Sequence, residues 1–271
     1  IATSFKVLSA SGAIQIIANG GTGSTAGMNN VLSTVNSYIG AGASTSSTSD
    51  IWLMADSVAF STPITGGTLP VLFKSSGNLT ILPVIANLPI NIGSADSAGG
   101  ASNQQINLAP TNFFNATANR QVFQTGFNSI TLGNARGTGA VTVQAAVNPQ
   151  DHLIIQSGSA QINVNANLTM ATGKSLTLIS NFRGAAANSS NTQPISGSAG
   201  LITTDFLNLM GSGSYGFSNP GNMIGTIASG GLYGDPMYPS TYNANLATSG
   251  TQATASLPFW IQVYNGRALT V

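Results

Sequence analysis

The chain has 271 residues, a net charge of +1 and only 5% charged side chains. This balance offers no electrostatic footprint for nucleic acid or anionic lipid. No apolar run reaches the roughly 18 residues that a transmembrane helix needs, and the lack of cysteine excludes disulfides and thiol chemistry. Glu is absent and Lys is scarce, so Thr, Val, Ile, Asn and Gly replace the usual helix surface formers. The composition favours an all-β protein with many turns.

Short runs of alternating apolar and polar residues recur along the chain, each bounded by Gly, Asn, Ser or Pro. They cover residues 5–10, 13–18, 50–55, 78–82, 90–93, 105–109, 129–133, 140–145, 152–157, 206–211, 223–228 and 260–265, and residues 162–180 supply two more. A period of two over four to six residues predicts strands. Their spacing is often about 8 to 12 residues, which also fits a sandwich or a barrel.

The strands resemble one another closely, and this similarity favours a β-solenoid. The patterns IN-I, IN-L and IN-V begin at Ile90, Ile106 and Ile162, and related patterns with Thr follow. A solenoid stacks each coil on a near-copy of itself, so like residues form ladders and Asn side chains can hydrogen-bond along them. At roughly 20 to 25 residues per coil, the chain would make about a dozen coils.

The segment from residue 162 to residue 180 gives the most detailed expectation. Its apolar residues are predicted to face inward, and its Asn and Thr residues are predicted to face outward or to form ladders. The inward set is Ile162, Val164, Leu168, Met170, Leu176 and Leu178, and the outward set is Asn163, Asn165, Thr169 and Thr177.

Four segments interrupt the repeat. Residues 28–40 carry apolar residues at helical spacing and predict a short helix or helical cap. Residues 40–50, 184–200 and 230–258 are irregular and are predicted to be loop excursions from a single solenoid region over residues 1–271. The last residues, NGRALTV, are interpreted as the start of another strand, so we expect the natural chain to continue or a second copy to cap it.

The order of units between Ile90 and Ser229 resembles filamentous-haemagglutinin-like repeats of bacterial two-partner-secretion exoproteins. A strand ending in Gly93-Ser94 is followed by a loop, a second strand and the unit ITLGNARGTGAVTV at residues 130–143. The unit ANLTMATGKSLTLIS at residues 166–180 continues the pattern. No single motif is diagnostic, and the chain lacks the secretion-domain signature of the family. The resemblance implies a right-handed parallel β-helix, secretion through the outer membrane, and a role in adhesion, surface fibres or the stalk of a delivery protein.

Three glycine motifs imitate nucleotide-binding sequences. ATGKS at residues 171–175 has Leu168 where a phosphate-binding loop needs glycine, and a strand follows it, so we interpret it as a turn. GTGSTA at residues 21–26 fits a dinucleotide fingerprint, which needs a βαβ unit with an acid at the end of its second strand. Asp50 instead precedes its strand, and no further alternation of strands and helices follows. GSGSYG at residues 211–216 is interpreted as a turn because FSNPGN, which follows it, cannot form a helix.

Candidate chemistry is sparse. His152 is the single histidine and Asp151 is its neighbour, which suggests a polar strand start more than part of a catalytic triad. One histidine without cysteine leaves no basis for a zinc site. The six Asp are mostly 40 or more residues apart in sequence, although coils can bring carboxylates together, so a carbohydrate-active enzyme remains an alternative.

An aromatic segment gives the one candidate contact site, formed by Tyr233, Tyr238, Tyr242 and Trp260 with Phe259. These side chains can stack on sugar rings or on a partner protein, which leaves a glycan-binding adhesin module as a further alternative. The leading hypothesis is a secreted, bacterial, non-catalytic β-solenoid that forms or decorates an extracellular fibre or a cell-surface stalk. It needs no cofactor or metal and is expected to self-associate, end to end or laterally, with a surface glycan or protein as a further partner.

Overall fold

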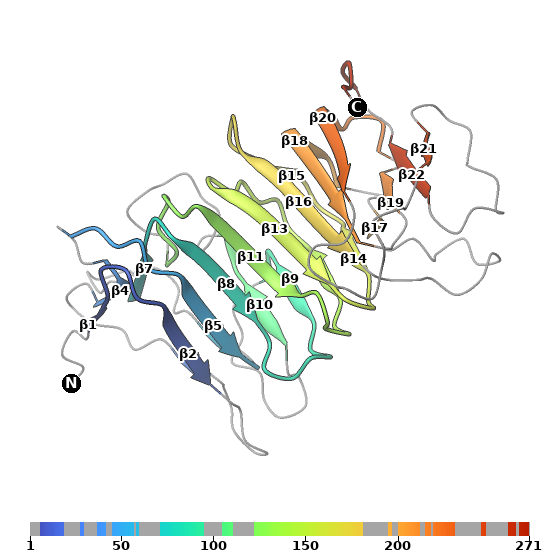
Figure 1. Cartoon of the computed structure of the whole chain (residues 1–271). Helices are drawn as coiled ribbons and strands as arrows, with labels where there is room; N and C mark the ends of the chain where they lie inside the picture. Colours follow the sequence, from blue (N-terminus) through green and yellow to red (C-terminus); the bar gives the residue numbers. More distant parts are fainter. Residues whose placement is uncertain are drawn as a thin grey trace.

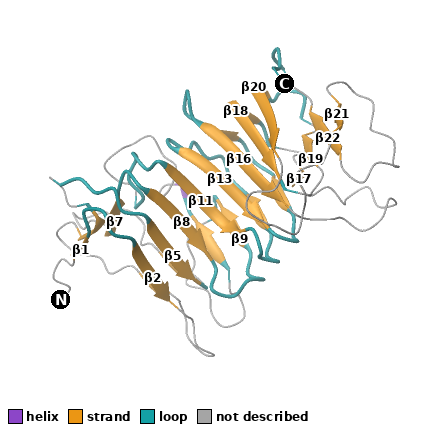
Figure 2. Ribbon diagram, viewed as in Figure 1, coloured by secondary structure: helices purple, strands orange, loops and turns teal. Residues whose placement is uncertain are grey.

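The structure of the chain is a computed structural model, and it shows an all-β protein built from parallel sheets (Figure 2). It describes residues 6–18, 28–29, 37–41, 45–56, 58–59, 71–94, 105–110, 122–180, 195–196, 200–211, 215–217, 219–230, 245–247, 260–263 and 266–270. The predicted strand-rich class is therefore confirmed, and almost no helix occurs within these ranges.

The longest sheet, called here the long sheet, contains nine strands in one continuous parallel arrangement. They are β2 (Ile14–Ala18), β5 (Ile51–Ala55), β8 (Asn78–Leu82), β11 (Ser129–Asn134), β13 (His152–Ser157), β15 (Leu168–Thr169), β16 (Ser175–Ser180), β18 (Ile202–Met210) and β20 (Met223–Gly230). Figure 1 shows β2, β5, β8, β11, β13, β16, β18 and β20 side by side in sequence order. Each strand is thus paired with its neighbours in this series, and β2 and β20 lie at its two ends.

A second sheet contains eight parallel strands, most of which lie in the sequence between consecutive strands of the long sheet. It contains β9 (Ile90–Ile92), β10 (Ile106–Leu108), β12 (Val141–Val143), β14 (Ile162–Val164), β17 (Ile195–Ser196), β19 (Tyr215–Phe217), β21 (Asn245–Ala247) and β22 (Trp260–Val263). Near the N-terminus, β1 (Lys6–Leu8), β4 (Ser37–Gly40) and β7 (Val71–Lys74) form a third parallel sheet, and β3 (Met28–Asn29) pairs with β6 (Val58–Ala59). From β8 onward, the chain alternates between the long sheet and the second sheet.

The register of the pairing explains why the strands look alike. Ile130 on β11 is opposite Leu153 on β13, which is opposite Leu176 on β16, and both steps span 23 residues. Like apolar residues therefore stack on one another at the inter-strand distance of about 4.8 Å. Other steps are longer: Leu79 and Ile130 are register partners 51 residues apart, because β9 and β10 lie between them. Such insertions leave a series of eight strands in the described long sheet where about a dozen coils were predicted.

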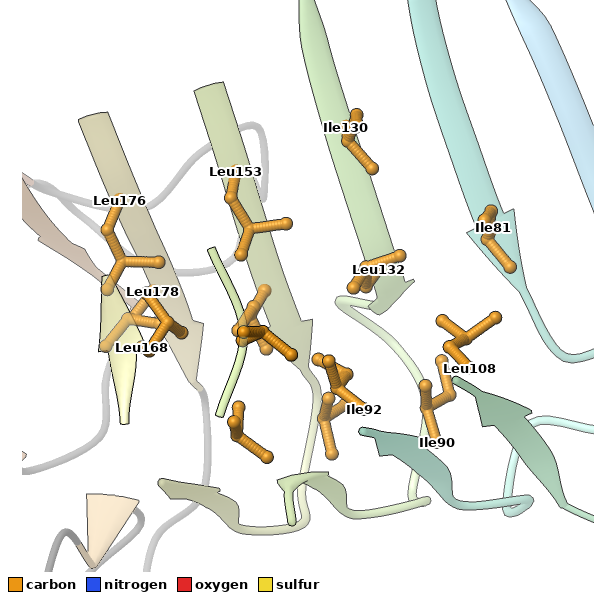
Figure 3. Close-up of a cluster of buried hydrophobic side chains, with 14 of the residues drawn as sticks. Ile81, Ile90, Ile92, Leu108, Ile130, Leu132, Leu153, Leu168, Leu176 and Leu178 are labelled. Atoms are coloured by element: carbon orange, nitrogen blue, oxygen red, sulfur yellow. The ribbon is translucent and has the colours of Figure 1, made fainter. Parts of the chain in front are cut away.

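The core lies between the long sheet and the second sheet. Leu153, Leu176 and Leu178 from the long sheet are fully buried, as are Ile90 and Ile92 from β9. Figure 3 shows such side chains from the two sheets directed toward one another. All six residues predicted to face inward between positions 162 and 180 are buried, as predicted: Ile162, Val164, Leu168, Met170, Leu176 and Leu178.

The polar ladders are also present. Asn91 Nδ2 donates to Asn107 Oδ1 across β9 and β10 at 3.0 Å, and Gln144 Nε2 donates to Asn91 Oδ1 at 3.0 Å. Asn163 Nδ2 lies 3.4 Å from its register partner, Thr142 Oγ1. These contacts bear out the expectation that Asn side chains bond along the stack, although Asn91 and Asn107 are buried.

The predicted helix at residues 28–40 is wrong over its described part. Met28–Asn29 is β3, and Ser37–Gly40 is β4, which pairs in parallel with both β1 and β7. Tyr38 and Ile39 are both buried although they are adjacent, a pattern that imitates helical spacing in the sequence. The hydrogen bonds of two neighbouring strands override the weak local preference. Residues 30–36 lie outside the described residues.

The segment at residues 266–270 contacts β20. Thr270 pairs in parallel with Thr226 of β20, and the two backbone hydrogen bonds around this bridge measure 2.8 and 3.0 Å. Arg267 fastens this segment through its guanidinium, whose Nη2 donates to Thr204 O at 2.8 Å.

Candidate functional site

The outward side of the long sheet, called here the outer face, belongs to the sheet with the most strands in the described structure. Side chains on it alternate with the buried residues of β5, β8, β11, β13 and β16. The pairing register sorts them into three rows. The first row is Asn78, Ser129, His152, Ser175 and Phe206; the second is Gln15, Trp52, Thr80, Thr131, Ile154, Thr177 and Asn208; the third is Ile17, Met54, Leu82, Gly133, Gln156, Ile179 and Met210. None of these residues is Lys, Arg, Asp or Glu.

The first row is held together by hydrogen bonds between strands. Asp50 Oδ1 accepts from Asn78 N at 2.8 Å and from Asn78 Nδ2 at 3.0 Å. Asn78 Oδ1 in turn accepts from Ser129 Oγ at 2.8 Å. The row therefore has a clear structural role in fixing the register of β8 against β11.

His152 and Ser175 form a close pair, but their geometry differs from that of a hydrolytic triad. His152 Nδ1 accepts the backbone N–H of Ser175 at 3.0 Å and lies 2.8 Å from its Oγ. A triad requires a carboxylate on that nitrogen to orient the ring. The Asp151 carboxylate instead accepts backbone N–H groups of Gly126 and Phe127 at 2.9 to 3.1 Å. The pair joins β13 to β16, which agrees with the interpretation of His152 as a polar residue at a strand start.

The described aspartates accept hydrogen bonds from backbone amides of segments that are distant in the sequence. Asp56 accepts from Ile85 N at 3.1 Å, and Asp205 accepts from Gly173 N at 2.9 Å and from Arg267 Nη2 at 3.4 Å. Burial raises the pKa of Asp151, partly offset by its two backbone donors, whereas the Gly173 amide and then Arg267 lower the pKa of Asp205. Asp96 and Asp235 lie outside the described residues. In the described ranges, no three His, Cys, Asp or Glu side chains are grouped to hold a metal ion.

The ATGKS segment is a turn, as predicted. Lys174 N donates to Ala171 O at 3.0 Å, and Gly173 has a φ of +75°, which favours glycine. β15 before this turn and β16 after it do not pair with each other; both pair with β18. β18 is one continuous strand where it pairs with β15 and β16. The turn between β15 and β16 is therefore an insertion relative to β18. GTGSTA at residues 21–26 lies outside the described residues.

The aromatic contact site predicted from the sequence is mostly outside the described residues. Tyr233, Tyr238 and Tyr242 fall there, as does Phe259. Trp260 begins β22, but its side chain is not described. The glycan-contact hypothesis for these five residues therefore stays a prediction.

A different exposed apolar cluster, called here the Trp52 patch, was missed. It consists of Ile17, Trp52, Met54 and Leu82 on three neighbouring strands; Ile17 is 55% and Trp52 43% exposed, and Met54 and Leu82 are half-buried. The sequence did carry the signal: in DIWLMA, Ile51 and Leu53 alternate with Trp52 and Met54, so one pair must face outward. Its neutral, apolar surface is suited to binding and supplies no acid, base or nucleophile.

No family model, curated protein or solved structure matches this chain. Among the described residues, no helix combines the length and the apolar character that crossing a membrane requires.

Proposed function

We propose that the chain is a segment of a secreted, non-catalytic β-helix that forms or decorates an extracellular fibre or a cell-surface stalk. The observation that carries this proposal is the register of the long sheet, where each strand is parallel to its successor and its inner residues stack like on like. Alternation of the chain between two parallel sheets is the pattern expected of a coil. The coil is right-handed in this proposal, because connections between parallel strands of one sheet are right-handed in almost all proteins.

The hydrogen bonds of the polar groups support a structural role. Asp50, Asp56, Asp151 and Asp205 each accept a backbone N–H from an adjacent layer, so the carboxylates act as corner ties. Serine hydroxyls near the N-terminus bridge distant backbone segments as donors: Ser47 Oγ donates to Ser9 O at 2.6 Å, and Ser75 Oγ donates to Ser49 O at 2.6 Å. A repeated polar corner favours a rod whose layers are locked in register.

The mechanism would be mechanical. Stacked layers bury a continuous apolar core, and a charge-poor exterior offers little repulsion to association with further copies, end to end or laterally. Membership of the filamentous-haemagglutinin-like group belongs to this proposal, as does location outside the bacterial cell.

Immunogold electron microscopy on the bacterium that encodes the chain tests this role. Antibodies against the purified chain are expected to label fibres or stalks on intact cells. Label found only inside sectioned cells would contradict the proposal.

A further inference from the structure

The Trp52 patch is unusual for the solvent-facing side of a sheet. The register places Trp52 between Gln15 and Thr80, and Met54 between Ile17 and Leu82. Four large apolar side chains thus occupy adjacent positions on β2, β5 and β8. Exposed apolar side chains scattered singly are ordinary, whereas a contiguous group marks a contact surface.

We infer that the Trp52 patch is the surface through which two copies of this chain pair face to face, laterally. The inference rests on the proposed structural function and assigns a place to its lateral self-association. Trp and Met are among the residues enriched at protein interfaces, and Trp is frequent among the residues that dominate their binding energy. In a two-fold arrangement the same patch supplies both sides, so Trp52 of one copy packs on the aliphatic residues of the other.

The charge distribution favours a second copy over a charged partner. No Lys, Arg, Asp or Glu occupies the outward positions of β2, β5 and β8. A nucleic acid, an anionic membrane or an acidic peptide would lose hydration on this surface without gaining an opposite charge. A second copy brings an equally neutral surface.

The arrangement of aromatic residues favours a protein over a polysaccharide. On the outer face, Trp52 is in the second row of β5 and Phe206 is in the first row of β18. Five strand spacings separate them, or about 24 Å. A sugar chain running along the described part of this face would therefore stack on one of these two rings at a time. The neighbours of Trp52 that complete the patch, Ile17, Met54 and Leu82, are aliphatic and suit a packed interface.

Two such faces would pack about 10 Å apart, as sheets do in a sandwich. The patch covers only three strands, so we expect a small interface and a weak dimer. Ile17 is more than half exposed, which allows a lysine there without disturbing the fold.

Sedimentation velocity of the whole chain over a concentration series tests the inference, with Ile17→Lys as the test variant and Ile154→Lys as its matched control. Ile154 also points outward, three strands from β5, or about 14 Å away. Because a two-fold interface contains each substitution twice, Ile17→Lys is expected to weaken pairing at least about tenfold. Ile154→Lys is expected to leave it within about twofold of the wild type. Circular dichroism checks that both variants keep their strands.

A wild-type chain that stays monomeric throughout the series would overturn the inference, as would equal weakening by the two lysine variants. A monomer whose tryptophan fluorescence changes with maltoheptaose, and no longer does so in Trp52→Phe, would overturn it in favour of a glycan. None of these results touches the stacking of the strands, which is measured separately, so the inference can fail while the proposed β-helix stands.

Discussion

On the inner face of the long sheet, each position repeats from strand to strand, whereas the outer face changes along the same strands. Leu79, Leu153 and Leu176 share one inner row and are fully buried. In the adjacent outer row, the side chain changes from Trp52 through Thr80 to Ile154. Stacking on a near-copy constrains the inner residues, and only solvent or a partner constrains the outer ones. The outer face therefore carries the side chains that vary from strand to strand, whereas the inner face repeats the same kind of residue.

The largest expected effect comes from the inner face. Leu176→Ala removes a fully buried side chain and is expected to cost about 2–5 kcal/mol in the free energy of unfolding. Thr177→Ala, one residue along on the outer face, is expected to change it by less than about 0.5–1 kcal/mol, even though Thr177 accepts a hydrogen bond from Asn208. Urea unfolding measures both, and similar losses would erase the distinction between the faces.

Gly133 interrupts the third outer row for a backbone reason. Its φ is +97°, and a Cβ there would collide with the carbonyl oxygen of Gln156 on β13. Gly133→Ala is expected to cost roughly 2–4 kcal/mol, since strain and collision add. Gly173→Ala is the control: its φ is also positive, at +75°, but a Cβ meets nothing within 4 Å. Thermal unfolding of the two variants should differ, and equal losses would remove the collision as the cause.

Asp151 tests the hydrogen bonds by which carboxylates join backbone segments that are distant in the sequence. Asp151→Ala leaves the N–H groups of Gly126 and Phe127 without their carboxylate acceptor and is expected to cost about 1–3 kcal/mol. Asp151→Asn keeps one acceptor oxygen and should lose less. Hydrogen exchange at the amides of Gly126 and Phe127 should quicken in the alanine variant, and unchanged protection there would contradict the tie.

The smallest effect is expected at the exposed Asp205, where it depends on pH. Hydrogen bonds from Gly173 and Arg267 lower its pKa below the ordinary 3.8. Its contribution is therefore fully present above about pH 4 and is lost as the pH falls through the lowered pKa. Asp205→Asn should be less stable than the wild type at neutral pH, and the difference should shrink in acid. A difference in stability that grows in acid would contradict a lowered pKa of Asp205.

The alternation of residues was enough to predict most strands and the inward set between residues 162 and 180, because a period of two fixes which side is buried. It was misleading at Tyr38 and Ile39, where both neighbours are buried and the spacing resembles a helix. The alternation in DIWLMA indicated that Trp52 and Met54 share one side of their strand. Only the register shows that Ile17 and Leu82 lie beside Met54. Asp151 could not be assigned from sequence, because its partners, Gly126 and Phe127, are 25 and 24 residues away in the preceding layer.

Pulsed electron resonance between spin labels tests the central claim, that the strands stack linearly as in a β-helix. The chain has no cysteine, so pairs introduced at second-row positions can be labelled cleanly. Gln15 and Thr177 are five strand spacings apart, and Gln15 and Asn208 are six, which predicts backbone separations of about 24 and 29 Å. Labelled distances that lengthen with each added strand would support the stack. A Gln15–Asn208 distance shorter than the Gln15–Thr177 distance would mean that the sheet curls back on itself and would contradict it.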